Sequence, residues 1–180
     1  MKTIEQNLSM YAAYHRDSRN IITHFIGIPM IVLAVVILLS RPSSAAGAVF
    51  TGLPLSPALW AALLMTIYYF IQDLRFGLAM GITLAAMLTV GVQVAQLPTA
   101  QWLGWGVGLF VVGWLIQFAG HYFEGKKPAF FDDIMGLAIG PLFVAAELAF
   151  LLGLCKDLKA AVEAKAGPVV ERTGWRPAGV

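Results

Sequence analysis

The three histidines of this 180-residue chain are its clearest candidates for chemistry, because imidazole binds metals and transfers protons near neutral pH. His15 and His24 lie in the segment YHRDSRNIITH, and His121 lies with Glu124 in GHYFEGKKPAFFDD. Imidazole and carboxylate ligands with open positions are typical of non-haem iron(II) oxygen chemistry, although zinc also accepts them. The spacing matches none of the compact zinc motifs, so the residue types alone leave metal binding as one interpretation among several.

Two ionisable residues lie within strongly apolar stretches, where a charge is costly. His24 falls in the first turns of one such stretch, and Glu147 falls inside another. Side chains at these depths usually face a protein interior and a partner. For Glu147, a structural hydrogen bond between helices is the alternative to a functional role.

The sequence between the first two histidines must turn if they are to share a site. In one continuous helix, nine residues place His15 and His24 roughly 180° apart around the axis. The segment RDSRN supplies the turn, with Asp17 or Ser18 as the expected N-cap of the following helix. This arrangement brings the two imidazoles within reach of one another.

The second block resembles the end of a helix followed by a loop. His121 and Glu124 are three residues apart and share a helix face. Lys127 precedes Pro128, which disfavours helical backbone and ends the helix there. Lys126 and Lys127 are expected to be solvated markers of topology, with attraction of a carboxylate head group as the alternative.

The elements that position these residues are expected to be membrane helices. The chain is 59% hydrophobic and only 12% charged, whereas soluble domains carry about 25% charge. Apolar runs suited to spanning helices cover residues 21–40, 58–71, 76–97 and 102–119. A fifth run, 134–154, contains the Gly140-Pro141 pair, which is expected to interrupt it.

The distribution of Lys and Arg predicts the topology, since these residues favour cytoplasmic loops. We expect an all-α, polytopic membrane helix bundle with four spans, an active face on the cytoplasmic side, and a Gly-Pro-broken re-entrant or fifth membrane helix. Ile4, Leu8 and Tyr11 recur at helical spacing and predict a short amphipathic N-terminal helix. Residues 1–160 are expected to form one membrane-embedded catalytic domain, and 161–180 a flexible tail.

Small residues along the expected spans offer close helix packing and, alternatively, a route to oligomers. They form three GxxxG pairs: Gly77/Gly81, Gly104/Gly108 and Gly136/Gly140. Packing within the chain is the simpler interpretation.

Several functional classes are disfavoured by the composition. The net charge of +2 gives no sign of nucleic-acid binding. A single cysteine, Cys155, excludes an intramolecular disulfide and a multi-cysteine metal site. The sequence also contains no phosphate-binding loop or dinucleotide fingerprint.

Two segments, YHRDSRNIITHFIGIP and QFAGHYFEGKKPAFFDDIMGLAIGPLFVAAEL, resemble the Mpo-type 2-hydroxy fatty acid dioxygenases. These are small polytopic membrane proteins, formerly a family of unknown function. The resemblance covers most of the chain, from about residue 5 to residue 155, and its specific part is these two blocks. It implies iron(II)-dependent α-oxidation, in which O₂ shortens a 2-hydroxy fatty acid by one carbon and releases CO₂.

The resemblance also implies roles for particular residues. His15, His24 and His121 are the implied iron ligands, and Glu124 or Glu147 is a fourth ligand or orients an imidazole. The cations implied for the substrate carboxylate are Arg16, Arg19, Lys126 and Lys127. No nucleotide cofactor is expected, since the substrate supplies all four electrons that O₂ accepts.

The resemblance places the chain in a bilayer, either a bacterial inner membrane or the endoplasmic reticulum. The alternatives are another metal-dependent membrane lipid enzyme, such as a hydroxylase or hydrolase, and a non-enzymatic membrane protein or transporter. A transporter is expected to place ionisable groups at mid-membrane on several spans, whereas here only Glu147 approaches that depth.

Overall fold

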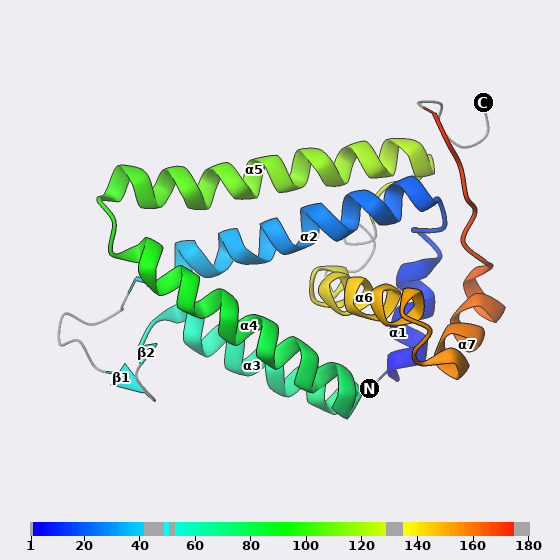
Figure 1. The fold of residues 1–180 in the computed structure, drawn as a ribbon, viewed down its shortest axis with the longest axis horizontal. Helices are drawn as coiled ribbons and strands as arrows, with labels where there is room; N and C mark the ends of the chain where they lie inside the picture. Colours follow the sequence, from blue (N-terminus) through cyan, green and yellow to red (C-terminus); the bar gives the residue numbers. More distant parts are fainter. Residues whose placement is uncertain (1, 42–48, 51–52, 129–134, 175–180) are drawn as a thin grey trace. The chain divides into compact units, whose positions relative to one another are not determined.

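The structure is a computed structural model that describes residues 2–41, 49–50, 53–128 and 135–174. Within these ranges the fold is helical, with one short β-hairpin (Figure 1). The elements are α1 (Ile4–Ala12), α2 (Ser18–Leu39), β1 (Val49–Phe50), β2 (Leu53–Pro54), α3 (Pro57–Gln72), α4 (Leu74–Ala95), α5 (Thr99–Glu124), α6 (Gly136–Leu151) and α7 (Lys156–Ala166). The predicted all-α fold class is confirmed.

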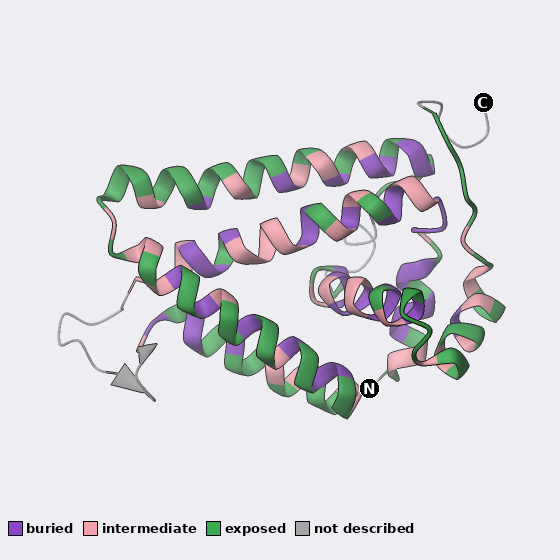
Figure 2. Cartoon of the chain, in the orientation of Figure 1, coloured by how far each residue is buried: buried purple, intermediate pink, exposed green. Residues whose placement is uncertain are grey.

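In the part of the chain that the structure describes, three helices, α2, α4 and α5, are long and apolar enough to cross a membrane. The predicted span 58–71 corresponds to α3, which has only 16 residues, fewer than the roughly 20 that a perpendicular span needs. Helices α6 and α7 together qualify as a fourth span, but they are bent by 117°. Much of the apolar surface of α4 and α5 is exposed (Figure 2), as expected for helices that face lipid.

The interruption of the fifth apolar run lies later than the sequence predicts. Helix α6 continues through Pro141, although this proline has no N–H to donate to the carbonyl four residues earlier. The chain changes direction between α6 and α7 instead, where Gly153 has φ 74° and Cys155 has φ 51°. These left-handed residues end the helix and redirect the backbone.

The chain divides into two compact units. Unit 1 comprises Met1–Ile28 and Trp114–Val180, and unit 2 comprises Pro29–Gly113. In unit 2, α3 and α4 pack as an antiparallel pair, and Gly77 allows the close approach. A Cβ added to Gly77 would lie 2.6 Å from the Phe70 Cα atom. The Gly77/Gly81 pair therefore serves packing within the chain, whereas a Cβ on Gly104 or Gly108 would meet nothing within 4 Å.

Unit 1 contains α1, the beginning of α2, the end of α5, and α6 and α7. The predicted amphipathic N-terminal helix is α1, which begins with a capping box between Thr3 and Gln6 and packs against α6 and α7. Helix α7 continues to Ala166, so the predicted domain boundary at residue 160 falls within a helix. Residues 167–174 then run along the segment that precedes α2, as described below.

Candidate metal centre

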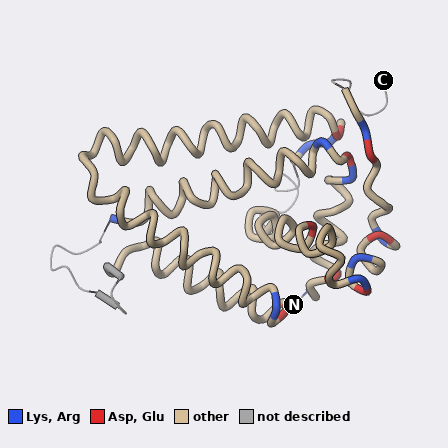
Figure 3. Tube along the Cα trace, viewed as in Figure 1, with Lys and Arg blue, Asp and Glu red and all other residues tan. Residues whose placement is uncertain are grey.

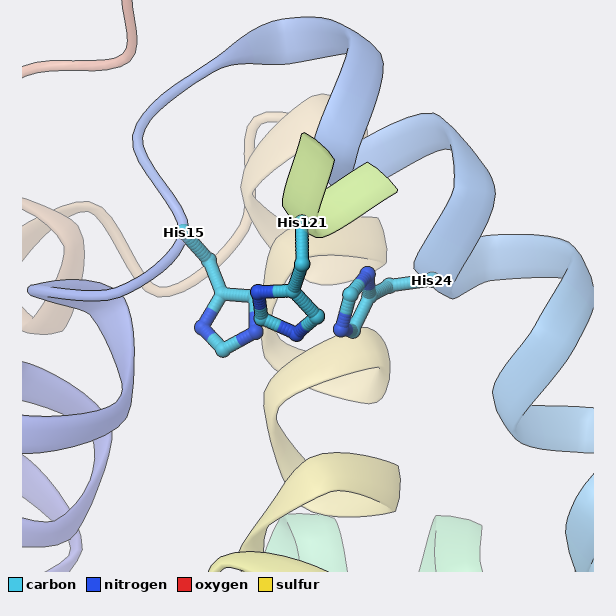
Figure 4. A group of neighbouring side chains, drawn as sticks. All are labelled: His15, His24 and His121. Carbon is cyan, nitrogen blue, oxygen red and sulfur yellow. The ribbon is translucent and has the colours of Figure 1, made fainter. Parts of the chain in front are cut away.

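The three histidines converge in unit 1 (Figure 4). His15 lies in the turn between α1 and α2, His24 lies on α2, and His121 lies in the last turn of α5. All three are buried, and one potential ligand atom from each lies within 4.8 Å of the others. Among the described residues, this group contains no carboxylate or thiolate.

Two of the rings are oriented by backbone carbonyls one helical turn earlier. The Nδ1 atom of His15 lies 2.6 Å from the Tyr11 carbonyl oxygen, and Nδ1 of His24 lies 2.8 Å from that of Asn20. Since a carbonyl only accepts, both Nδ1 atoms must donate, which leaves each Nε2 with a lone pair. The sequence therefore sets the tautomer that a metal ligand needs.

Buried nitrogen atoms at the centre have no hydrogen-bond partner. These atoms are Nε2 of His15 and Nδ1 of His121. Unpaired polar atoms are rare in protein interiors, because they forfeit their bonds to water. A bound metal ion would satisfy the Nε2 lone pair of His15.

The surroundings of His15 keep its ring neutral. The Tyr11 ring stacks on it, with centroids 4.2 Å apart and planes 4° from parallel, and Phe143 lies 5.5 Å away. Burial, followed by the nearby His24, lowers the pKa of His15 well below 6.5. A neutral imidazole is the form that binds metal.

The donor set fits a first-row transition metal. Nitrogen–metal bonds of about 2.1 Å place two ligand atoms on one ion no more than about 4.2 Å apart. The rings therefore need only a small inward movement to share an ion. Three imidazoles leave further coordination positions open, which suits non-haem iron oxygen chemistry and also the three-histidine sites of catalytic zinc.

Glu124 lies in a different position from that expected of a ligand. Its carboxylate accepts the backbone N–H groups of Arg16, at 3.0 and 3.1 Å, and Asp17, at 2.8 Å, and the side-chain amide of Asn20 at 3.1 Å. The last turn of α5 is thus joined to the turn that carries His15. The reason is local, since N–H groups at the start of a helix lack helical partners and attract a carboxylate.

Glu147 forms a buried ion pair with Arg16, at 3.1 Å. The other two nitrogens of this guanidinium also donate: Nε donates to the carbonyl oxygens of Ala12 and His15, and Nη1 donates to that of Gly167. Arg16 therefore holds the turn around His15 together. Glu147 therefore stabilises the His15 turn through its ion pair with Arg16, and not by orienting an imidazole.

The other cations expected to attract the substrate carboxylate differ in their contacts within the protein. Arg19 pairs with Asp17 at 2.7 Å, donates to the Gly174 carbonyl, and lies 4.8 Å from the centre of the Phe123 ring. Asp17 also accepts the N–H of Arg19 with its side chain, so it caps α2 as predicted. Lys126 and Lys127 are exposed at the end of α5, and Lys126 donates to the Ala13 carbonyl.

Sequence reasoning missed the roles of Tyr11 and Gly120. Tyr11 supplies both a stacking ring and the carbonyl that orients His15, and its signal was its position four residues before that histidine. Gly120 lies where α5 approaches α2, and a Cβ there would overlap the Thr23 hydroxyl and lie 2.5 Å from Asn20 Oδ1. No sequence pattern reveals such a helix crossing.

Comparison with known proteins gives two consistent findings. A family model described as 2-hydroxy-palmitic acid dioxygenase Mpo1-like matches residues 1–152. The 2-hydroxy-palmitic acid dioxygenase MPO1 of Saccharomyces cerevisiae (strain ATCC 204508 / S288c) is 31% identical over 163 residues, which cover 89% of this chain and 87% of the yeast protein. No solved structure matches the chain significantly.

Proposed function

The chain belongs to the Mpo1-like family, and we propose that it is a membrane-embedded, iron(II)-dependent dioxygenase that shortens 2-hydroxy fatty acids by one carbon. The observation that carries this proposal is the convergence of three buried histidines from three separate elements. The name of the yeast relative, a 2-hydroxy-palmitic acid dioxygenase, supplies the substrate class and the use of O₂. Three imidazole ligands accept iron(II), the metal suited to this oxygen chemistry.

The reaction balances without an external reductant. A 2-hydroxy acid and O₂ give the acid shortened by one carbon, CO₂ and water. The bond between the carboxyl carbon and the hydroxyl-bearing carbon breaks, and the substrate loses the four electrons that O₂ gains. Iron(II), when bound, would supply the site at which O₂ and the substrate oxygens meet.

The residues of the chain supply position and charge. His15, His24 and His121 hold the metal, with the Tyr11 and Asn20 carbonyls fixing two of the rings. Because the Lys126 and Lys127 side chains are exposed, whereas Arg16 is buried and Arg19 half-buried, we assign attraction of the substrate carboxylate to the two lysines. Glu124 and Glu147 contribute indirectly, by stabilising the turn that carries His15.

Membrane helices suit a fatty acyl substrate. Burial of the alkyl chain among apolar side chains contributes about 0.8 kcal/mol per CH₂. Among the described residues, every Lys and Arg other than Arg41 and Arg75 belongs to unit 1 (Figure 3). Unit 1 also holds the three histidines. We therefore place the reaction at the cytoplasmic membrane face.

The decisive experiment combines metal analysis with product analysis on one purified sample. Protein in lipid nanodiscs is loaded anaerobically with iron(II), and 2-hydroxypalmitic acid and O₂ are then added. We expect about one iron per chain and the fatty acid shortened by one carbon, detected by mass spectrometry. Protein that binds iron but converts no 2-hydroxy acid would overturn the proposed reaction.

A pair of adjacent variants separates chemistry from folding. His121→Ala should lose iron and reduce turnover more than about 100-fold, since it removes one of three ligands. Tyr122→Ala changes the next residue, whose side chain is exposed, and should keep turnover within about twofold. Unchanged turnover in His121→Ala would remove this residue from the ligand set.

A further inference from the structure

The segment that follows α7 lies beyond the residues matched by the family model and pairs with the turn that carries His15. The N–H of Val170 donates to the Arg16 carbonyl at 2.8 Å, and the N–H of Ser18 donates to the Val170 carbonyl at 3.0 Å. These bonds form a parallel β-bridge between Asp17 and Val170. Two residues on, the Arg172 N–H donates to the Ser18 hydroxyl at 3.1 Å.

Side chains reinforce this backbone pairing. Arg16 donates to the Gly167 carbonyl at 3.1 Å, and Arg19 donates to the Gly174 carbonyl at 2.7 Å. Arg172 lies 3.9 Å from the Asp17 carboxylate. Residues 167–174 therefore touch every residue from Arg16 to Arg19.

From these contacts we propose that residues 167–174 form a positioning strap, which holds the His15 turn in the geometry needed to bind metal. This inference rests on the proposed metal centre. His24 and His121 are held by helices, whereas His15 lies in a non-helical turn and depends on its neighbours for its position. Glu124 holds the N–H side of this turn, and the strap holds the carbonyl of Arg16.

The strap also completes the N-terminus of α2. Ser18 is the first residue of that helix, and its N–H has no partner within the helix. The Val170 carbonyl accepts this N–H. Detachment of the strap would leave the N–H without its partner and loosen the segment that separates His15 from His24.

The strap is anchored to the same helix that orients His15. Helix α7 packs on α1, and Lys165 pairs with Glu5 at 2.7 Å. Gly167 then has φ 84°, a left-handed conformation that favours glycine and lets the chain turn from α7 towards the His15 turn. Helix α1 carries Tyr11, so α1 and the strap hold His15 from both of its flanks.

The test compares Val170→Pro with Glu171→Pro in the full-length protein in nanodiscs. Proline at 170 removes the N–H that bonds to Arg16, and the Val170 side chain is already 41% exposed. Proline at 171 is the matched control, because the Glu171 N–H donates to none of the described residues 16–19. Iron(II) titrated anaerobically into metal-free protein measures affinity, and hydrogen exchange reports on the Ser18 amide.

We expect Val170→Pro to weaken iron(II) binding about tenfold and to speed exchange of the Ser18 amide, with Glu171→Pro close to wild type. Equal effects of the two variants, or unchanged affinity and exchange in Val170→Pro, would overturn the strap. If Val170→Pro does not fold, truncation after Ala166 replaces it, with truncation after Gly174 as its control. Wild-type protein that binds no iron would instead contradict the proposed function, while the exchange experiment would still test whether the strap is docked.

Discussion

Unit 1 and unit 2 are both helical, but they differ in what they bury. Among the described residues, the buried polar side chains of unit 1 are Asn7, Ser9, His15, Arg16, Asp17, Asn20, His24, Gln117, His121, Glu124 and Glu147; those of unit 2 are Ser40 and Ser56. Polar burial is costly unless each group finds a partner. The difference indicates that unit 1 is organised around chemistry and unit 2 around packing in the membrane.

The means of holding helices together differ accordingly. In unit 2, α4 contacts α3 through glycines, and the Trp102 indole donates to the Ile37 carbonyl at 2.8 Å. In unit 1, the Glu124 carboxylate and the Arg16 guanidinium connect segments more than 100 residues apart. Substitutions of the buried polar residues of unit 1 should therefore change metal binding, whereas substitutions in unit 2 should change stability alone.

The largest effect is expected from removal of a helical metal ligand. His24→Ala should lose bound iron and reduce turnover more than about 100-fold, because two imidazoles no longer define the site. Metal analysis by mass spectrometry and a turnover assay measure the two effects. Ile22→Ala is the control on the same helix, since that side chain is 59% exposed; full iron binding by His24→Ala would contradict the assignment.

A second prediction concerns the helix crossing at Gly120. Gly120→Ala should lower the free energy of unfolding by about 1–3 kcal/mol, because the new Cβ would overlap the Thr23 hydroxyl. It should also weaken iron binding, since the next residue is His121. Gly104→Ala, where a Cβ meets nothing within 4 Å, should leave iron binding unchanged and raise stability slightly.

Glu124→Gln tests the contact between the end of α5, which carries His121, and the turn that carries His15. A neutral amide keeps the size of the side chain but loses charge-assisted acceptance of the Arg16 and Asp17 N–H groups. We expect Glu124→Gln to lower the free energy of unfolding by about 1–3 kcal/mol and to weaken iron binding. Thermal unfolding and iron titration measure the two effects. The control is Glu163→Gln on α7, which removes a partly exposed ion pair with Lys159 and should change stability and iron binding little. Equal losses in the two variants would contradict the role of Glu124 in connecting α5 to the His15 turn.

The sequence predicted the helices and the convergence of the three histidines, but not the partners of the charged side chains around them. Apolar runs locate membrane helices because the bilayer selects for length and hydropathy, and the RDSRN turn followed from helical geometry. The sequence could not show whether Glu124 binds a metal or a backbone, because both attract a carboxylate. That choice depends on where α5 ends relative to the start of α2.

The tail illustrates the same limit. Its two prolines, three glycines and few aliphatic residues predict a segment without fixed structure, yet residues 167–174 pair with the His15 turn. A single parallel bridge leaves no periodic pattern in the sequence. The bend after α6 was misplaced for a related reason, since Gly140-Pro141 is a stronger local signal than the left-handed Cys155.

The smallest effect is expected in unit 2, at the cap of α4. Asp73 accepts the N–H groups of Arg75 and Phe76, so Asp73→Ala should cost about 1 kcal/mol of stability with iron content unchanged. Burial raises the pKa of Asp73, but its bonds to Arg75 and Phe76 outweigh this, and the pKa lies below its ordinary value.

A lowered folded-state pKa means that the carboxylate stabilises the fold above its unfolded pKa of about 3.9 and loses this contribution as pH falls through the folded pKa. The difference in melting temperature between wild type and Asp73→Ala should therefore stay constant from pH 7 to about pH 5 and shrink below about pH 4. A loss of bound iron in Asp73→Ala would contradict the division of roles between the two units, because this cap lies in the unit that contains none of the three histidines.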